Sequence, residues 1–284
     1  MPKQISFLSF YLTISIFSFS CDKSTQETQS SNTDTIPIDK HWTFETSPEW
    51  SDEFNKDGKP NTANWGYDIG GNGWGNNELE YYTAGDNASV ANGILTIEAR
   101  KENVDTNHYT SARMVTKNKA DFLYGRFEIS AKLSNGKGLW PAIWMLPTDW
   151  KYGDWPKSGE VDIMEQVGFD PENIHISTHT GAFNWVQNTQ KTAVINVPTA
   201  TTDFHIYRVD WTPYSIRGFI DGKQYFEFVN DGQGYMHWPF DQKFHILLNV
   251  AIGGGWGGQQ GVDDSIFPAT MQVDYVRVYK MIDK

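Results

Sequence analysis

Strict alternation of apolar and polar residues is the feature that most constrains the fold of this chain, and residues 125–133 show it most clearly. Every second residue from Phe127 to Leu133 is apolar, and every residue between them is charged or polar. Side chains on a β-strand point alternately to its two faces, so a period of two predicts a strand with one face buried.

Similar short runs recur along the chain, each bounded by Gly, Pro, Asn or Asp. They are 94–99, 205–211, 215–220, 224–228, 244–252 and 271–279. The pair Asp221-Gly222 between two of these runs is a hairpin signal. No stretch beyond residue 41 has ten residues of apolar spacing at 3.6, and no repeat of fixed period is present. We predict an all-β fold of antiparallel strands in two packed sheets, with little helix.

The N-terminal segment has the features of an export signal. Residues 1–20 carry Lys3 and an apolar run of about fifteen residues, shorter than the roughly 20 needed to cross a bilayer. Cys21 follows directly, and the arrangement resembles a bacterial lipoprotein signal, in which this cysteine is lipidated. We expect an exported bacterial lipoprotein at the outer membrane or cell surface, or otherwise a secreted protein.

The rest of the chain divides into a tether and one domain. Residues 21–41 have almost no apolar content and predict a flexible tether. Residues 42–284 contain no second linker, so we expect a single domain there.

Charge and cysteine content exclude several classes of partner and site. With 23 basic and 35 acidic residues the formal net charge is −12. So acidic a chain lacks the basic surface that nucleic-acid binding requires. The single cysteine excludes an internal disulfide framework and a cysteine-based zinc cluster. We expect no nucleic-acid partner, membrane contact only through the N-terminal lipid anchor, and a monomer.

Three acidic residues lie close together in the segment 159–168. On a regular strand Glu160 and Asp162 share one face with Met164, while Glu165 points to the other. Burying a lone carboxylate among apolar neighbours is costly. One extra residue, a β-bulge around Ile163 and Met164, would return Glu165 to the face of Glu160 and Asp162.

Crowded carboxyl groups suit acid–base chemistry, because some of them hold a proton to higher pH while others stay ionised. Two carboxyl groups that flank a bond are what glycoside hydrolysis needs. The alternative is a solvated acidic strand face, and the neighbouring residues decide between the two.

Those neighbours are aromatic. Trp140 and Trp144 are four residues apart, on one face if the segment is a strand, and further tryptophans are Trp74, Trp150, Trp155, Trp185 and Trp256. Sugars present flat C–H faces that stack on such rings. For any single tryptophan a place in the core is the alternative. Trp74 and Trp256 lie in glycine-rich loops, which carry function more often than packing.

Six further motifs occur in an order that resembles glycoside hydrolase family 16, in particular its bacterial laminarinase-like endo-1,3-β-glucanases. The motifs are 50–54, 73–79, 109–113, 140–144, 248–254 and 273–279. The resemblance extends over residues 45–280. It implies a concanavalin-like β-jelly-roll sandwich of two antiparallel sheets, with a concave substrate cleft.

The resemblance also implies catalytic roles. Glu160 matches the nucleophile of a retaining double displacement, Glu165 the general acid/base, and Asp162 the carboxylate that tunes both. Relatives of the lichenase type lack the residue at Met164, so its presence points to the laminarinase, agarase and carrageenase side. The family pattern further implies sugar contacts by Asn76, Arg113, Trp140, Trp144, His179 and Trp256. The net acidity favours an uncharged glucan over a sulfated one.

Metal and cofactor signals are few. The resemblance implies a structural calcium at Glu53, Gly93 and Asp274, with a metal-free surface as the alternative. We expect no cofactor for catalysis. A zinc pair of His175 and His179 is disfavoured because their surroundings favour strand, not helix. Residues 71–75 are a glycine-rich loop that no lysine follows, so a nucleotide site is disfavoured as well.

The sequence thus predicts an endo-acting, retaining β-glucanase that hydrolyses internal 1,3-β bonds of laminarin-like glucans through a covalent glycosyl-enzyme intermediate. One alternative is hydrolysis of another β-linked polysaccharide, such as a mixed-linkage glucan or a galactan. Another is a non-catalytic carbohydrate-binding jelly roll.

Overall fold

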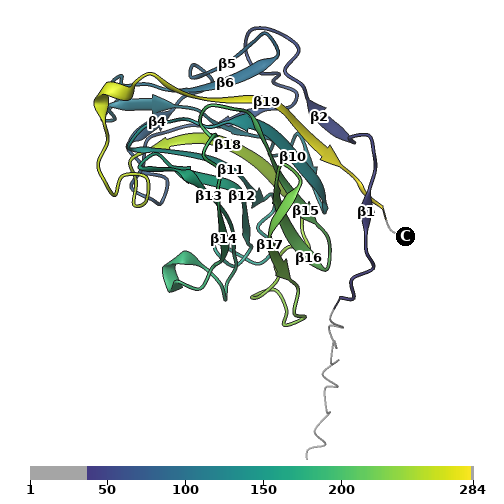
Figure 1. The fold of residues 1–284 in the computed structure, drawn as a ribbon. Helices are drawn as coiled ribbons and strands as arrows, with labels where there is room; N and C mark the ends of the chain where they lie inside the picture. The colour runs from purple at the N-terminus through teal and green to yellow at the C-terminus, as the bar shows by residue number, and fades with distance from the viewer. Residues whose placement is uncertain (1–36, 283–284) are drawn as a thin grey trace, which may run out of the picture. The chain divides into compact units, whose positions relative to one another are not determined.

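Two eight-stranded sheets packed face to face make up most of the computed structural model, which describes residues 37–282 (Figure 1). The predicted signal peptide, Cys21 and most of the predicted tether lie outside the described residues. Within 37–282 the only helices are two 3₁₀ turns, η1 (Trp185–Gln187) and η2 (Asp264–Ile266). Neither could cross a bilayer.

The first sheet, called here the β10 sheet, has the order β17-β16-β15-β10-β19-β6-β5, and β2 also pairs with β19. Its strands are β2 (Trp50–Asp52), β5 (Ala88–Ala91), β6 (Ile94–Ala99), β10 (Gly125–Lys132), β15 (His205–Trp211), β16 (Ser215–Ile220), β17 (Lys223–Val229) and β19 (Ala269–Tyr279).

The second sheet, called here the β12 sheet, has the order β14-β13-β12-β11-β18-β8-β3, and β9 also pairs with β18. Its strands are β3 (Gly66–Asp68), β8 (Arg113–Val115), β9 (Asp121–Phe122), β11 (Leu139–Pro147), β12 (Glu160–Val167), β13 (Asp170–His179), β14 (Lys191–Asn196) and β18 (Phe244–Ile252).

Two small sheets complete the described strands. β1 (Thr43–Phe44) pairs with β20 (Met281–Ile282), so the early chain lies beside its end. β4 (Glu80–Tyr82) pairs with β7 (Tyr109–Ser111) in parallel. The predicted all-β fold and the two antiparallel sheets are confirmed, and the parallel β4–β7 pair is an addition that the sequence did not indicate.

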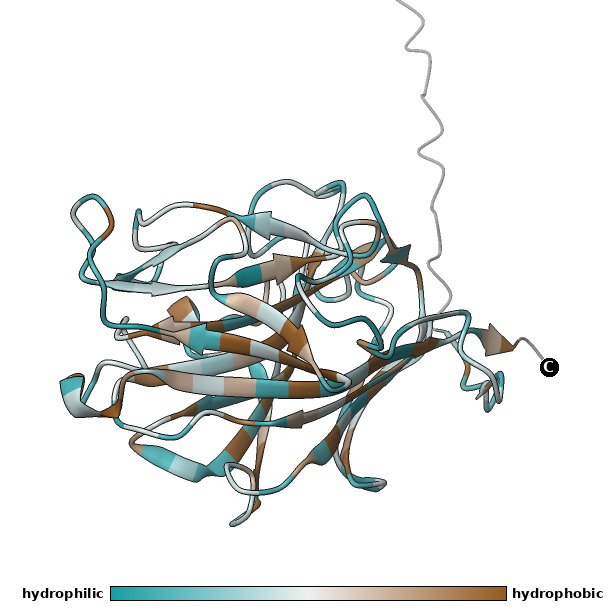
Figure 2. Cartoon of the chain, turned by 90° about the horizontal axis from the view of Figure 1, so that it is seen from above, coloured by the Kyte–Doolittle hydropathy of each residue, from teal (hydrophilic) through white to brown (hydrophobic). Residues whose placement is uncertain are grey.

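Alternation along the strands builds the core between the sheets. In β10, Phe127, Ile129 and Ala131 are fully buried, while Arg126 and Glu128 are partly exposed. Figure 2 shows the same alternation of hydrophobic and hydrophilic residues along the strands. The buried apolar side chains of both sheets form one contiguous cluster. Since burial of apolar area is the main favourable term in folding, this pattern accounts for the sandwich.

The predicted hairpin is present between β16 and β17. Asp221 and Gly222 have φ values of 49° and 80°. Two central residues with positive φ are the requirement of a type I′ turn, whose twist matches that of the flanking strands.

Candidate active site

The central strand β12 contains the predicted bulge. On one side, Asp162 pairs with Trp144 of β11 and Met164 with the preceding residue, so Ile163 has no partner. On the other side the register also shifts between Asp162 and Glu165. Ile163 and Met164 are both buried in the core. Two successive side chains therefore point inward, and Glu165 returns to the face of Glu160 and Asp162.

His179 from the neighbouring strand β13 joins this face. It pairs in register with Glu160. Its Nε2 lies 3.2 Å from Oδ2 of Asp162 and 3.9 Å from Oε1 of Glu160. Asp162 is only 2% exposed, whereas Glu160 and Glu165 keep part of their surface accessible. The site therefore has one buried carboxyl group between two that a ligand could reach.

Burial shifts the proton affinity of all three carboxyl groups. Burial, with a contribution from the Asp162 carboxylate, raises the pKa of Glu160 to about 8. Burial raises the pKa of Glu165 to about 7. Burial and then the Glu165 carboxylate raise the pKa of Asp162 well above its ordinary range. The groups titrate as a set, so the site keeps protons near neutral pH, as general acid catalysis requires.

The order of the two pKa values does not assign the roles, because a nucleophile must be ionised and Glu160 has the higher value. Two neighbours favour its ionised form. His179 lies 3.9 Å away, and Trp155 donates a hydrogen bond to the Glu160 carboxylate. Both neighbours act to lower the pKa of the Glu160 carboxyl group, against the effect of burial.

Aromatic side chains surround Glu165. The Trp140 indole N–H donates to Oε1 of Glu165 at 3.0 Å. The Trp256 ring packs edge-on against Trp140, with ring centroids 5.4 Å apart, and against His175, at 4.8 Å. His175 is also the register partner of Glu165, a position that sequence reasoning considered only for zinc.

Arg113 and Trp144 meet on the neighbouring part of this face. The guanidinium of Arg113 lies 4.8 Å from the ring of Trp74 and 4.6 Å from the ring of Trp144. Its Nε also pairs with Oδ2 of Asp68 at 3.0 Å. Trp144 pairs in register with Asp162, so this cation–aromatic group adjoins the carboxyl set.

Asn76 lies at the end of a hydrogen-bond chain that reaches the same tryptophan. Its Nδ2 donates to Oε1 of Glu78, and the chain continues through Tyr82 and Asn249 to Trp144. The quoted motifs contain Glu78 and Asn249, but sequence reasoning named neither as a site residue. Tyr82 lies outside all of them.

Other tryptophans extend from the Glu160 end. The Trp155 ring lies 5.9 Å from His179 and 6.1 Å from Trp185. Trp185 is 54% exposed. Trp150 has a positive φ in the loop between β11 and β12.

Glu160, Asp162 and His179 could also hold a metal ion. Their ligand atoms lie within 4.8 Å of one another, and residues 37–282 contain no other such group of three His, Cys, Asp or Glu. Because the same three residues belong to the carboxyl set, the cluster has an explanation in acid–base chemistry without a metal. His175 is not part of it, so the structure does not pair the two histidines on one ion.

The predicted calcium residues lie on or next to neighbouring strands of the β10 sheet. β19 pairs with β2 just before Glu53 and with β6 just after Gly93, and both pairings approach Asp274. Both oxygens of Glu53, however, accept hydrogen bonds from the Arg277 guanidinium, at 2.9 and 2.7 Å. That pairing lowers the pKa of Glu53. The Glu53 side chain is therefore already paired, and the Asp274 carboxylate and main-chain carbonyls remain as the candidate calcium ligands of the predicted set.

Comparisons with known proteins agree on one family. The family model described as glycosyl hydrolases family 16 matches residues 75–277. A β-glucanase of Rhodothermus marinus is 52% identical over 252 residues, which cover 86% of this chain and 87% of the relative. The crystal structure of the laminarinase from Rhodothermus marinus is 51% identical, with a TM-score of 0.83 over 85% of this chain and 99% of that one.

A second solved structure is described as SCLam, a non-specific endo-β-1,3(4)-glucanase. It is 46% identical, with a TM-score of 0.79, and the match covers 86% of this chain and 92% of that one.

Proposed function

The chain belongs to glycosyl hydrolase family 16, and from this premise we propose that it is an endo-acting, retaining β-glucanase that hydrolyses internal 1,3-β-glucosidic bonds of laminarin-like glucans. The observation that carries the proposal is the bulge of β12, which brings Glu160, Asp162 and Glu165 to one face. The Rhodothermus marinus structure is described as a laminarinase, which supports a laminarin-like glucan as the substrate.

The proposed reaction proceeds in two displacements. The Glu160 carboxylate attacks the anomeric carbon while the glycosidic C–O bond breaks, and Glu165 gives its proton to the departing oxygen. Glu165, now ionised, then takes a proton from water, whose oxygen attacks the same carbon as the bond to Glu160 breaks. Each displacement inverts the anomeric centre, so the product retains the starting configuration.

The surroundings suit these roles. The raised pKa of Glu165, about 7, leaves a proton available near neutral pH. Trp140 donates a hydrogen bond to Glu165 and so orients the carboxyl group and stabilises its ionised form. Asp162 is buried between the two glutamates and beside His179, and its carboxyl group influences the pKa of Glu160. We assign the role of nucleophile to Glu160 because it matches the nucleophile position of the family pattern.

Six residues around the carboxyl set are the proposed sugar contacts, and five of them contact the carboxyl groups or one another. They are Asn76, Arg113, Trp140, Trp144, His179 and Trp256. The indole rings offer flat apolar surfaces for sugar C–H faces, and the polar side chains offer partners for hydroxyl groups.

The test combines substrates with two variants. Purified protein is incubated with laminarin, lichenan, agarose and carrageenan, and proton NMR follows the anomeric configuration of fresh products. We expect rapid release of β-configured oligosaccharides from laminarin. Glu160→Gln and Glu165→Gln should each lose turnover by orders of magnitude and keep the fold. Glu172→Gln on the same sheet is the control and should keep the parental turnover. Parental release of sugar by Glu160→Gln would refute the assignment.

Mixed-linkage glucan is the second candidate substrate, because SCLam is described as a non-specific endo-β-1,3(4)-glucanase. Faster cleavage of lichenan than of laminarin in the same assay would favour it. Cleavage of agarose alone would favour a galactan.

We propose that the enzyme is exported and anchored through lipidated Cys21, because an apolar run of signal type ends at the only cysteine. Cys21→Ser should abolish incorporation of labelled fatty acid and release active protein from the membrane fraction. Unchanged labelling in this variant would refute the anchor.

A structural calcium is proposed as well, held by the Asp274 carboxylate and the main-chain carbonyls of Glu53 and Gly93. Calcium binds hard oxygen ligands of this kind. When bound, it would link β2 and the β5–β6 turn to β19. These elements belong to the β10 sheet, whereas the carboxyl set lies on the β12 sheet.

A further inference from the structure

A directed chain of hydrogen bonds links two of the proposed sugar contacts, Trp144 and Asn76, through buried side chains. The Trp144 indole N–H donates to Oδ1 of Asn249 at 2.7 Å. Nδ2 of Asn249 donates to the Tyr82 hydroxyl at 3.0 Å, and that hydroxyl donates to Oε2 of Glu78 at 3.0 Å. From the other direction, Nδ2 of Asn76 donates to Oε1 of Glu78 at 3.0 Å.

Chemistry fixes the direction of each step. An indole nitrogen can only donate, so Asn249 must turn its oxygen to Trp144 and its amide nitrogen to Tyr82. The Tyr82 hydroxyl accepts that bond and donates its own O–H to Glu78. Each Glu78 oxygen accepts one of the bonds, from Tyr82 and from Asn76, so Glu78 ends the chain from both sides.

The chain is shielded from water and has few alternatives. Tyr82 is fully buried, and Glu78 and Asn249 are 8% and 5% exposed. A buried polar group that loses its partner costs free energy, so each member holds the next in place. The link from Glu78 to the Trp144 ring therefore has one stable arrangement.

A second buried carboxyl group, that of Glu80, lies next to Glu78 at the end of the chain. It is fully buried, and one of its oxygens accepts the backbone N–H of Ile252 at 2.6 Å. Burial and the nearby Glu78 carboxylate raise the pKa of Glu80 well above its ordinary range. Protonation of Glu80 is therefore favoured in this buried position.

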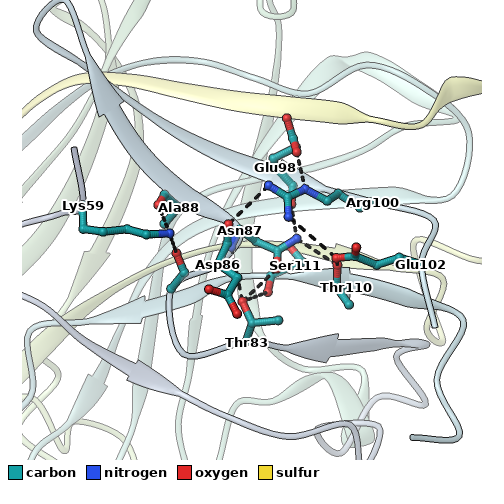
Figure 3. Close-up of polar contacts among 11 residues, drawn as sticks. Lys59, Thr83, Asp86, Asn87, Ala88, Glu98, Arg100, Glu102, Thr110 and Ser111 are labelled. Carbon is teal, nitrogen blue, oxygen red and sulfur yellow. Dashed lines mark hydrogen bonds and ion pairs between the residues drawn. The ribbon is translucent and has the colours of Figure 1, made fainter. Parts of the chain in front are cut away.

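The chain that follows β4 is held by a second hydrogen-bond network, around Asn87. Figure 3 shows Asn87 bonded to the backbone oxygen of Glu98, to the Thr110 hydroxyl and to the Thr83 hydroxyl. Asn87 and Thr83 are buried. Binding sites keep their geometry when the supporting residues are themselves locked by hydrogen bonds, and this network provides that support for β4.

We propose that Glu78 is a positioning residue of the enzyme, which through Tyr82 and Asn249 fixes the orientation of the Trp144 ring and also holds Asn76 for substrate binding. The proposal rests on the proposed function, because it takes Trp144 and Asn76 as sugar contacts. Glu78 itself touches no reacting atom. The role is distinct from acid–base catalysis, so it should be visible in KM more than in kcat.

Removal of a single hydroxyl tests the chain. Tyr82→Phe should raise KM for a laminarin oligosaccharide about tenfold, the effect of one lost buried hydrogen bond, and should lower kcat much less. Tyr207→Phe is the matched control, because Tyr207 is also fully buried but its hydroxyl has no hydrogen-bond partner. It should leave KM unchanged.

A double-mutant cycle identifies the residue through which the chain acts. Trp144→Phe removes the indole donor that begins the chain. If Tyr82 acts by orienting Trp144, adding Tyr82→Phe to Trp144→Phe should change KM by less than about twofold, since coupled residues are not additive. Equal factors in both backgrounds would overturn the proposal, and so would a Tyr82→Phe protein that behaves like Tyr207→Phe.

Calorimetry of the same oligosaccharide binding to each variant in the Glu165→Gln background gives the corresponding ratios of affinity without turnover. A protein with intact Glu165 that neither cleaves nor binds any tested β-glucan would refute the proposed function. A protein that binds and cleaves one, but in which Tyr82→Phe has no effect on KM or affinity, would refute the positioning role alone.

Discussion

Single buried titratable residues give this protein opposing dependences of stability on pH. Burial raises the pKa of Glu160 and Glu165 above their ordinary values and lowers the pKa of His245 to about 3. The unfolded chain releases the glutamate protons more readily, so their contribution to stability falls as pH rises through 7 and 8. The unfolded chain binds a proton at His245 more readily, so that contribution falls as pH drops below about 6.5.

Replacement of an active-site carboxyl should therefore stabilise the fold at alkaline pH. The pKa of Glu165 is about 7 in the folded protein against an ordinary 4.5, so its contribution is complete below 4.5 and lost as pH rises through 7. Glu165→Gln should raise Tm at pH 8, by about 2–4 °C if the gain is near 1 kcal/mol, and should leave it unchanged at pH 4. Differential scanning calorimetry at the two pH values measures this, with Glu172→Gln as control. An equal shift at both values would contradict the argument.

At the scale of the element, β12 combines regular alternation with one irregularity. Four predicted runs agree with the observed strands residue for residue: β6, β15, β16 and β18. β12 differs because Ile163 and Met164 both enter the core. The bulge brings five residue steps into the space of four and so keeps Glu165 opposite its partner on β11.

Two deletions test this parity. Deleting Met164 alone should give a regular strand in which Glu165 still shares the face of Glu160, so hydrolysis should remain measurable. Loss of a fully buried Met side chain should cost about 2–5 kcal/mol of unfolding free energy. Deleting Ile163 and Met164 together should turn Glu165 into the core and abolish hydrolysis.

Urea unfolding and an assay of released reducing sugar check both variants. Abolished activity in the folded single deletion would contradict the parity argument, because only a strand without a bulge would move Glu165 to the other face on losing one residue.

At the scale of the whole molecule, the early chain is held against the last strand. β1 pairs with β20 and β2 with β19. The Glu53–Arg277 ion pair spans the same seam. The proposed calcium would add a further link there, between Asp274 and the turns that precede β6 and follow β2.

Chelation should thus reduce stability more than cold activity. EDTA should lower Tm of the parental protein, while the rate of laminarin hydrolysis measured well below Tm should stay constant. Asp274→Asn should make Tm insensitive to EDTA, since the carboxylate ligand is lost. Thermal melts with and without calcium provide the measurement, and a parental melting curve that EDTA does not change would count against the site.

The sequence by itself determined the strands and the face of the three acids, because both follow from the local period of two and from the cost of burying a lone carboxylate. It also supplied the motif that places Trp140 and Trp144 four residues apart on β11. These features depend on neighbours in the chain.

Only the tertiary structure decided which distant side chains meet. Trp140 donates to Glu165, Trp256 packs between Trp140 and His175, and Tyr82 reaches Asn249 across 167 positions. The parallel β4–β7 pair and the Arg277 partner of Glu53 belong to the same class. Such contacts depend on strand register and sheet packing, which no local pattern encodes, and the pKa of a carboxyl group depends on burial that exists only after the sheets have closed.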